Sequence, residues 1–276
     1  MSDELASPDP WSELRRHTPA RIALGSAGGS LPTLEGLRFA ADHAQARDAV
    51  HLALDLPALR AELSGIGWQQ PVIEVRSQAN NREVYLRRPD LGRKLDPASH
   101  AALQAAASSA ADLAIVLADG LSAAAVQSHA GPLLQSLRAE LPPDWSLAPL
   151  VIATQARVAL GDEIGALLKA RLVLMLIGER PGLSSPESLG AYLTFAPTPG
   201  RSDAERNCVS NIRPQGLAPA AAARRIAWLL AEALRRQLSG VSLKDDSAAL
   251  IAGGIPAAAL ADPANLASPA ANVSLK

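Results

Sequence analysis

The side chains best suited to chemistry stand where apolar runs end. Glu179 and Arg180 follow the unbroken apolar run 172–177, inside the segment Gly178-Glu179-Arg180-Pro181-Gly182. Proline lacks an amide donor and glycine tolerates positive φ, so the chain must leave a strand there and expose a carboxylate and a guanidinium. Two further polar segments follow apolar runs in the same way, and they are Asp119-Gly120 and Gln155-Ala156-Arg157-Val158. Such groups can bind a ligand through hydrogen bonds.

Cysteine and histidine offer little for catalysis or metal binding. Cys208 is the only cysteine, so an intrachain disulfide is impossible and a cysteine-based metal cage is excluded. Without a recognisable base, a single cysteine is more often a packed residue than a nucleophile. The sequence has no G-x-S-x-G, no H-E-x-x-H and no G-x-G-x-x-G after a strand. We therefore assign no catalytic residue and no metal ligand, and the pattern favours a protein that binds a large molecule.

The apolar runs predict the elements that position these residues. Strands are expected at 113–118, 149–154, 172–177 and 189–195, with helices at 121–141, 161–170 and 218–238. Strand-helix alternation is typical of an α/β fold with a doubly wound, Rossmann-like parallel sheet. The carboxyl ends of parallel strands meet at one edge, where such sheets bind ligands. We expect residues 119–120, 155–158, 178–182 and the chain from Pro197 onward to gather there.

Three regions are expected along the chain. Residues 1–96 form an N-terminal, mostly helical region, with helices at 11–16 and 33–51 and a hairpin or pair of extended segments within 71–88. Residues 97–244 begin with an alanine-rich helix at 97–111 and form the Rossmann-like domain. Residues 245–276 are rich in alanine, proline and serine and are expected to be a poorly ordered tail, with at most one short helix near 248–251.

The composition excludes several classes of partner. The 276 residues are 48% hydrophobic but only 3% aromatic, so alanine, leucine and valine must build the core. A formal net charge of −1 gives no basic footprint for nucleic acid or anionic lipid. The acidic N-terminus has no apolar signal region, and no apolar stretch approaches the roughly 18 residues of a membrane span. We expect a cytoplasmic protein with no nucleic-acid or membrane partner.

Several ordered stretches resemble one known family. LIGERPGLSSPESLGAY (176–192) and RNCVSNI (206–212) resemble the small (light) subunit of ethanolamine ammonia-lyase. The resemblance runs from Glu13 to Gly240. Further matching stretches are TPARIALGSAG (18–28), LRFAADHAQARDAV (37–50), EVRSQANNREVYLRRPDLGRKL (74–95), LADGLSA (117–123) and RVALGDEIGALL (157–168).

The resemblance implies a function that composition does not show. The family's holoenzyme converts ethanolamine to acetaldehyde and ammonia with adenosylcobalamin as cofactor. Its large subunit, a TIM barrel, carries the substrate site and the catalytic residues. The small subunit is Rossmann-like and closes over the cobalamin at the subunit interface, and both subunits assemble into a larger hetero-oligomer. Some members carry a longer N-terminal extension associated with bacterial microcompartments; here the match begins at Glu13, which leaves such packaging open.

The resemblance also implies cobalamin contacts at Val158, Glu179 and Cys208. These residues lie on or just after expected strand ends, where the residue pattern had already placed a site. Ordinary structural roles are the alternatives. Val158 could be core, Cys208 could be buried packing, and Glu179 could form a salt bridge with Arg180 or Arg206.

Two other functions fit the same sheet edge. The first is a stand-alone α/β enzyme, such as a hydrolase or transferase, that uses Cys208 or Glu179. The second is a regulatory small-molecule binding module with no catalytic partner. Turnover by the isolated chain would indicate the former, and assembly without lyase activity the latter.

Overall fold

A six-stranded sheet forms the centre of the molecule, in the order β1-β3-β2-β4-β5-β6. The computed structural model describes residues 9–107 and 109–247. The α/β class and all four predicted strands are confirmed, and the run at 172–177 is the middle of β4. The strands are β1 (Val72–Arg76), β2 (Ala111–Ala118), β3 (Leu150–Thr154), β4 (Ala170–Gly178), β5 (Leu189–Phe195) and β6 (Arg206–Ile212).

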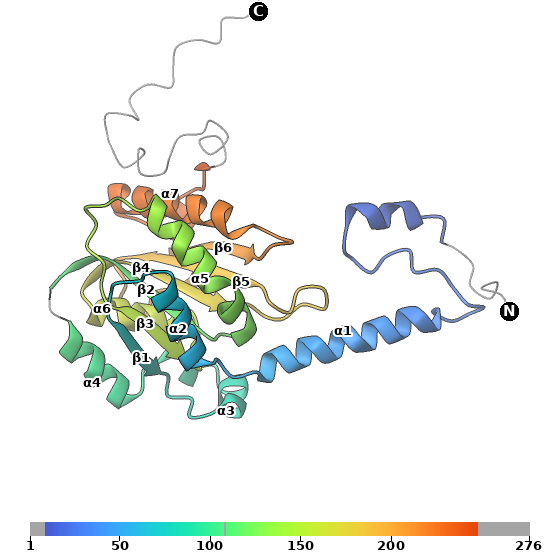
Figure 1. Ribbon diagram of the computed structural model, residues 1–276, viewed down its shortest axis with the longest axis horizontal. Coiled ribbons are helices and arrows are strands. Elements are labelled where there is room, and N and C mark those ends of the chain that lie inside the picture. Colours follow the sequence, from blue (N-terminus) through green and yellow to red (C-terminus); the bar gives the residue numbers. More distant parts are fainter. Residues whose placement is uncertain (1–8, 108, 248–276) are drawn as a thin grey trace, which may run out of the picture.

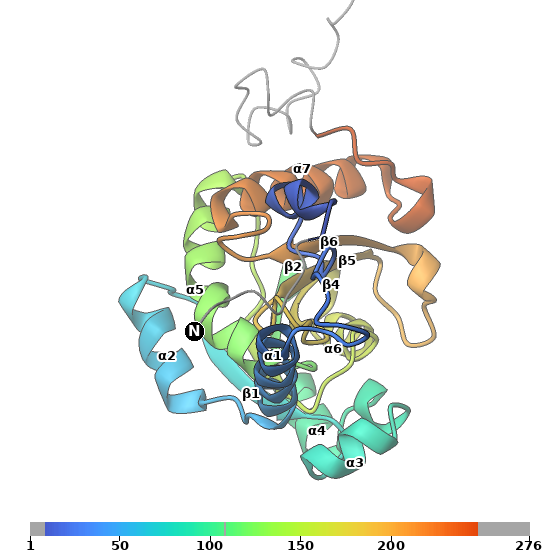
Figure 2. The same ribbon diagram turned by 90° about the vertical axis from the view of Figure 1, so that its right-hand side faces the viewer.

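Helices pack on both faces of this sheet (Figures 1 and 2). One face carries α2 (Leu56–Gly65), α5 (Ala123–Glu140) and α7 (Pro219–Arg236), and the other carries α4 (Pro97–Ala106) and α6 (Leu160–Leu167). Strand β4 serves both cores because its side chains alternate. Leu172, Leu174 and Leu176 join the core of α5 and α7, whereas Val173, Met175 and Ile177 join that of α6. A strand covered on both faces must be apolar throughout, as this one is.

The sheet is mostly parallel, but the strand expected at 189–195 does not share the direction of the others. Strands β1, β3, β2 and β4 are mutually parallel, but β5 runs antiparallel to β4, with Gly178 opposite Leu189. The β4–β5 connection, residues 179–188, contains no helix, and a parallel crossover needs about a dozen residues or more. Because β5 is reversed, the chain from Pro197 onward lies at the opposite edge from the other expected site segments. Strand β6, which the sequence did not predict, pairs antiparallel with β5.

The segment around Tyr85 is helical, so the predicted extended segment at 84–86 is also wrong. Only the first half, β1, is a strand, and it pairs with β3 of the main sheet. Residues Arg82–Arg87 form α3, whose first turn is capped by Asn81 because its side chain accepts a hydrogen bond from the Val84 amide at 2.9 Å. Tyr85 is fully buried and donates a hydrogen bond to the Ala156 carbonyl at 3.0 Å. Local capping and this tertiary contact outweigh the strand propensity of the branched and aromatic side chains.

Helix α1 (Thr33–His51), predicted at these bounds, projects away from the sheet (Figure 1). The expected helix at 11–16 is the 3₁₀-helix η1 (Ser12–His17), and its segment folds back along α1. Ion pairs of Arg21 with Asp42 and of Arg15 with Glu35 link the chain before α1 to this helix, and we call the whole segment the N-terminal arm (residues 9–52). Within the described residues, seven of the eight large apolar side chains that are exposed belong to the arm: Trp11, Leu14, Leu31, Leu34, Leu37, Phe39 and Leu52.

The remaining elements are three short 3₁₀-helices. They are η2 (Leu91–Arg93), η3 (Asp203–Glu205) and η4 (Gly240–Ser242). Within residues 9–107 and 109–247, no helix has the length and apolarity needed to cross a bilayer. The predicted tail lies outside the described residues except for 245–247, as does the short helix expected near 248–251.

Candidate cofactor-binding site

A cavity of about 440 Å³ opens at the carboxyl edge of the parallel strands. It lies where β2 and β4 end side by side, and the chain leaves these strands in opposite directions, toward β3 and toward β5. This reversal is the place where open α/β sheets bind ligands. The lining comes from five separated parts of the chain: Tyr85, Gly120, Leu121, Arg157, Val158, Ile177, Gly178, Glu179, Arg180 and Tyr192.

Two glycines let the ends of β2 and β4 approach closely enough to form the cavity floor. A Cβ on Gly178 would lie 1.9 Å from the Ser122 carbonyl oxygen, and one on Gly120 would lie 2.2 Å from that of Gly178. Gly120 also has a φ of +55°, which favours glycine. The backbone of the two loops therefore packs directly, without intervening side chains.

A buried carboxylate fixes the turn that carries Arg157 and Val158. Gln155 adopts a left-handed φ of 54°, an uncommon conformation for a residue with a side chain. Asp119 stabilises that turn because its two oxygens accept hydrogen bonds from the amides of Gln155 (2.8 Å) and Ala156 (3.1 Å). Burial raises the pKa of Asp119, while these amides and the Arg82 guanidinium at 3.7 Å oppose that shift.

Two guanidinium groups lie over the ring of Tyr85. The Arg82 and Arg157 guanidinium carbons lie 4.8 Å and 4.4 Å from the ring centroid. Arg82 ties the arm to this edge, since it donates hydrogen bonds to the carbonyls of Val50 (2.6 Å) and Gly120 (2.7 Å). Arg157 instead lines the cavity. The ring thus packs against a cationic side chain of the cavity.

Glu179 points one carboxylate oxygen at protein groups and leaves the other without a partner. Its Oε2 accepts hydrogen bonds from the Ser188 hydroxyl (2.5 Å) and the Asn211 amide (3.2 Å). Its Oε1 accepts none among the described residues, and Gly190 leaves room for it. Glu179 forms no ion pair in the described part of the chain, so the alternative of a salt bridge to Arg180 or Arg206 is wrong.

The structure brings the three expected site residues together. Val158 and Glu179 line the same cavity, as does Tyr192, and Cys208 is the cross-strand partner of Tyr192. Directly opposed side chains in a sheet have Cβ atoms about 5 Å apart. Cys208 lies within β6, not at a strand end, and is exposed, so the alternative of buried packing is wrong. Val158 is only partly buried.

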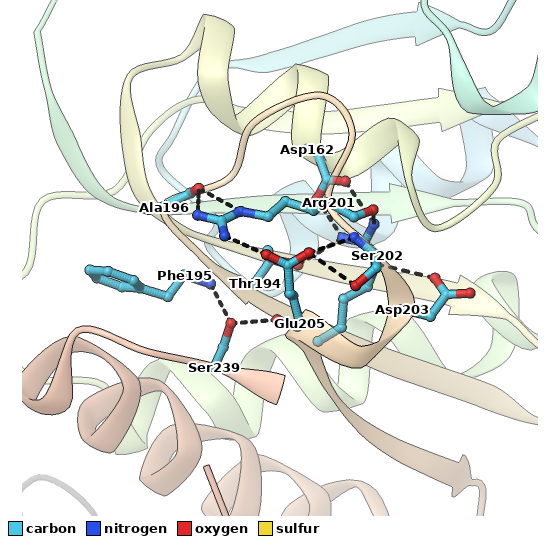
Figure 3. Close-up of polar contacts among 10 residues, drawn as sticks. Asp162, Thr194, Phe195, Ala196, Arg201, Ser202, Asp203, Glu205 and Ser239 are labelled. Atoms are coloured by element: carbon cyan, nitrogen blue, oxygen red, sulfur yellow. Dashed lines mark hydrogen bonds and ion pairs between the residues drawn. The ribbon is translucent and has the colours of Figure 1, made fainter. Parts of the chain in front are cut away.

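A buried ion pair connects the helix that follows Val158 with the strand that carries Cys208. Arg206, two residues before Cys208, donates two hydrogen bonds to Asp162 in the first turn of α6, at 2.5 Å and 2.8 Å. Its remaining donors reach Thr194, the Arg201 carbonyl and Asp203. Figure 3 shows Asp162 and Thr194 beside the loop that carries Arg201, Ser202, Asp203 and Glu205.

Tyr85 and Tyr192 belong to the cavity but were not expected there from sequence, whereas Arg157 was expected at this edge as part of the segment 155–158. The chain has only two tyrosines, and both line this one cavity. The tyrosines were the signal available in the sequence, because they are few and each combines an apolar ring with a polar hydroxyl, as a ligand-binding wall requires. Across residues 9–107 and 109–247, no group of three or more His, Cys, Asp and Glu side chains could hold a metal ion.

Together these features define an α/β protein with an open cavity at the sheet edge where such folds bind ligands. The chain belongs to the ethanolamine ammonia-lyase light chain family, since that family's model, "Ethanolamine ammonia-lyase light chain (EutC)", matches residues 8–244.

Proteins named ethanolamine ammonia-lyase small subunit are similar over nearly the whole chain. The one from Bradyrhizobium diazoefficiens is 58% identical over 250 residues, which cover 90% of this chain and 95% of the relative. That of Azotobacter vinelandii is 56% identical over 252 residues, covering 90% and 93%. That of Pseudomonas syringae pv. tomato is 53% identical over 251 residues, covering 90% and 87%. The family expected from sequence is confirmed.

Proposed function

We propose that this chain is the small subunit of an adenosylcobalamin-dependent ethanolamine ammonia-lyase and helps bind the cobalamin at its interface with a catalytic large subunit. The reaction is the conversion of ethanolamine to acetaldehyde and ammonia. The observation that carries the proposal is that Val158 and Glu179 line one open cavity, while Cys208 lies across the sheet from Tyr192 of the same cavity wall. The relatives are named as small subunits of that lyase, which supports a two-subunit enzyme.

The residues around the cavity fit a corrinoid. Cobalamin presents an apolar ring edge, several amide groups that donate and accept hydrogen bonds, and a nucleotide tail. The cavity offers apolar walls together with polar atoms that lack partners among the described residues, namely Glu179 Oε1 and the buried Arg157 Nε. A cavity of about 440 Å³ suits a drug-sized molecule. A whole cobalamin is larger, so this chain would cover one side of it and a partner the other.

Each of the three residues has a distinct role in this proposal. Val158 gives an apolar wall, and Glu179 accepts hydrogen bonds from corrin amide groups with its free oxygen. Cys208 places a small polarizable side chain against the ring. Adenosylcobalamin, when bound, supplies radical chemistry that begins with homolysis of its cobalt–carbon bond. The chain's own contribution is to orient the cofactor and to exclude water from that side.

The N-terminal arm is the proposed docking surface for the large subunit, a TIM barrel in our expectation. Leu34 and Leu37 on α1 are 57% and 64% exposed, and Phe39 is 47% exposed. Apolar side chains gathered on one projecting segment are typical of an interface. Arg82 connects the end of α1 to the cavity floor through Val50 and Gly120. The arm and the cavity would therefore meet the same partner, within a larger hetero-oligomer of both subunits.

The test is cobalamin binding by the assembled two-subunit complex. Glu179→Ala should raise the dissociation constant for adenosylcobalamin roughly tenfold, because a hydrogen bond to a charged acceptor is worth about 1.5 kcal/mol or more. Glu187→Ala is the matched control, an exposed glutamate of the same loop that does not line the cavity. An unchanged dissociation constant for Glu179→Ala would remove this residue from the site. Ethanolamine turnover by the isolated chain would contradict the proposal as a whole.

A further inference from the structure

The Arg157 side chain lines the cavity and packs on its neighbours. Its carbon lies 4.4 Å from the centroid of the fully buried Tyr85 ring. Gly92 leaves room for the side chain, since a Cβ there would lie 2.9 Å from Arg157 Cγ, and the Arg157 amide donates to the Gly92 carbonyl at 2.8 Å. An arginine fixed in this way has already lost the rotamer freedom that binding would otherwise cost.

The hydrogen-bonding capacity of Arg157 is almost unused. Among the described residues its guanidinium donates one hydrogen bond, a long one of 3.4 Å to the Tyr85 carbonyl. Its Nε is buried and has no partner, and no carboxylate of the described chain forms an ion pair with it. A buried donor without a partner costs about 1–3 kcal/mol. The Arg157 guanidinium therefore stands at the cavity as a positive charge that no carboxylate of the described chain pairs with.

The neighbouring arginines behave differently. Arg206 satisfies its guanidinium with five hydrogen bonds and pairs with Asp162. Arg82 Nη1 lies 3.7 Å from Asp119 Oδ2, and the Arg82 guanidinium donates hydrogen bonds to two backbone carbonyls. Arg180 lines the cavity but is exposed to solvent, which screens its charge. Glu179 lines the same cavity, but within the described residues it forms no ion pair with Arg157, and its Oε2 is held by Ser188 and Asn211. Arg157 alone combines a fixed position, a cavity wall and a missing anion.

We propose that Arg157 binds the phosphodiester of the adenosylcobalamin nucleotide tail. This inference rests on the proposed function, because it names the contact that one part of that ligand makes. The phosphodiester is the only anionic group on the periphery of cobalamin. The planar guanidinium matches two phosphate oxygens with parallel N–H donors, and such charge-assisted bonds are stronger than neutral ones. The nucleotide tail would thus lie toward Tyr85, with the corrin ring toward Glu179 and Cys208.

The experiment compares three corrinoids on the two-subunit complex by equilibrium dialysis. Adenosylcobalamin and adenosylcobinamide phosphate carry the phosphate, and adenosylcobinamide lacks it. Arg157→Gln should raise the dissociation constants of the first two roughly 10- to 100-fold and change that of adenosylcobinamide less than about threefold. Arg93→Gln, which removes the same charge from an exposed position that does not line the cavity, should change all three less than about threefold.

Each alternative result has a defined meaning. Equal losses for all three corrinoids in Arg157→Gln would overturn the proposal, because the arginine would then support the fold or pair with the large subunit. Equal losses in both arginine variants would also overturn it, since a general charge effect would explain them. Retained adenosylcobinamide binding shows that the variant is folded. Failure of the proposed function is distinguishable, because the wild-type complex would then bind cobalamin no better than the large subunit alone.

Discussion

Two arginines near the cavity show how the same side chain takes opposite roles according to its partners. Arg206 is 7% exposed and donates two hydrogen bonds to Asp162, so its charge is matched within the chain. Arg157 is stacked on Tyr85 and has no counter-ion among the described residues. The first arrangement fixes α6 against β6, and the second leaves a charge for a ligand. The residue type alone does not indicate which of the two arginines is paired within the chain.

Removing one partner of the buried pair should be far more damaging than removing an exposed pair. Asp162→Asn leaves the Arg206 charge buried without its carboxylate, so the free energy of unfolding should fall by about 3–5 kcal/mol. The exposed Glu83–Arg87 pair at 3.1 Å is the control, and Glu83→Gln should cost less than about 0.5 kcal/mol. Urea denaturation monitored by circular dichroism measures both. A loss below about 1 kcal/mol for Asp162→Asn would show that the pair is not a structural link.

The Cys208 thiol should be unreactive at neutral pH. Although the residue is exposed, desolvation of its sulfur raises the pKa of Cys208, and the negative charge of Glu179 raises it further. The thiolate is the reactive form, so alkylation should be slow at pH 7 and increase only as the pH passes the usual thiol range near about 8.5.

The measurement is iodoacetamide labelling of the free chain followed by mass spectrometry, with a short cysteine peptide as the reference thiol. Glu179→Gln removes the negative charge and lowers the pKa of Cys208, so labelling at pH 8 should quicken roughly two- to fivefold. Labelling of the wild-type chain at pH 7 as fast as the reference peptide would contradict the assigned environment. Cys208 is the only cysteine, so the signal is unambiguous.

At the scale of elements, the cavity depends on strand ends that touch through glycine. The ends of β2 and β4 are neighbours in the sheet, and Gly120 and Gly178 allow their loops to pack backbone to backbone. The reversed strand β5 then brings Tyr192 back to the same cavity, and β6 adds Cys208 beside it. The site is therefore completed by the antiparallel part of the sheet.

A side chain at Gly178 should separate these two loops. In Gly178→Ala the new Cβ would meet the Ser122 carbonyl oxygen, so the free energy of unfolding should fall by about 1–3 kcal/mol or more. Gly36→Ala is the control, because that glycine lies on α1 with open space around it, and alanine should be neutral or stabilising by up to about 1 kcal/mol. Thermal unfolding of both variants tests this, and equal melting temperatures would refute the tight packing of the loops.

At the scale of the whole molecule, a closed α/β body carries an arm that buries little of its own apolar surface. Within α1 only Glu35 and Ala49 are buried. Figures 1 and 2 show α1 extending from one side of the body, with the segment of η1 beside it. A helix in this position gains little from packing in the isolated chain. We therefore interpret the exposed apolar residues of the arm as one side of a subunit interface.

Polar substitutions on the arm should impair assembly without harming the fold. Leu34→Asn combined with Leu37→Asn should leave the melting temperature of the free chain within about 2 °C and weaken association with the large subunit at least roughly tenfold. Val241→Asn is the matched control, since Val241 is 77% exposed but lies outside the arm. Sedimentation of mixed subunits gives the association constant. Equal assembly by the double variant and the control would place the interface elsewhere.

The sequence by itself determined the α/β class, the strands that became β2 to β5 and most of the helices, because continuous apolar runs and helical periodicity report local burial directly. It also placed Val158 and Glu179 after strand ends, where the cavity lies.

Only the tertiary structure decided that Tyr85 is helical, that β5 is antiparallel and that Cys208 sits on a strand beside Tyr192. These features depend on contacts between distant segments, such as the Tyr85 hydroxyl with Ala156, which leave no periodic pattern in the chain. The unmatched charge of Arg157 was equally invisible, since a missing partner can be recognised only when all neighbours are in place.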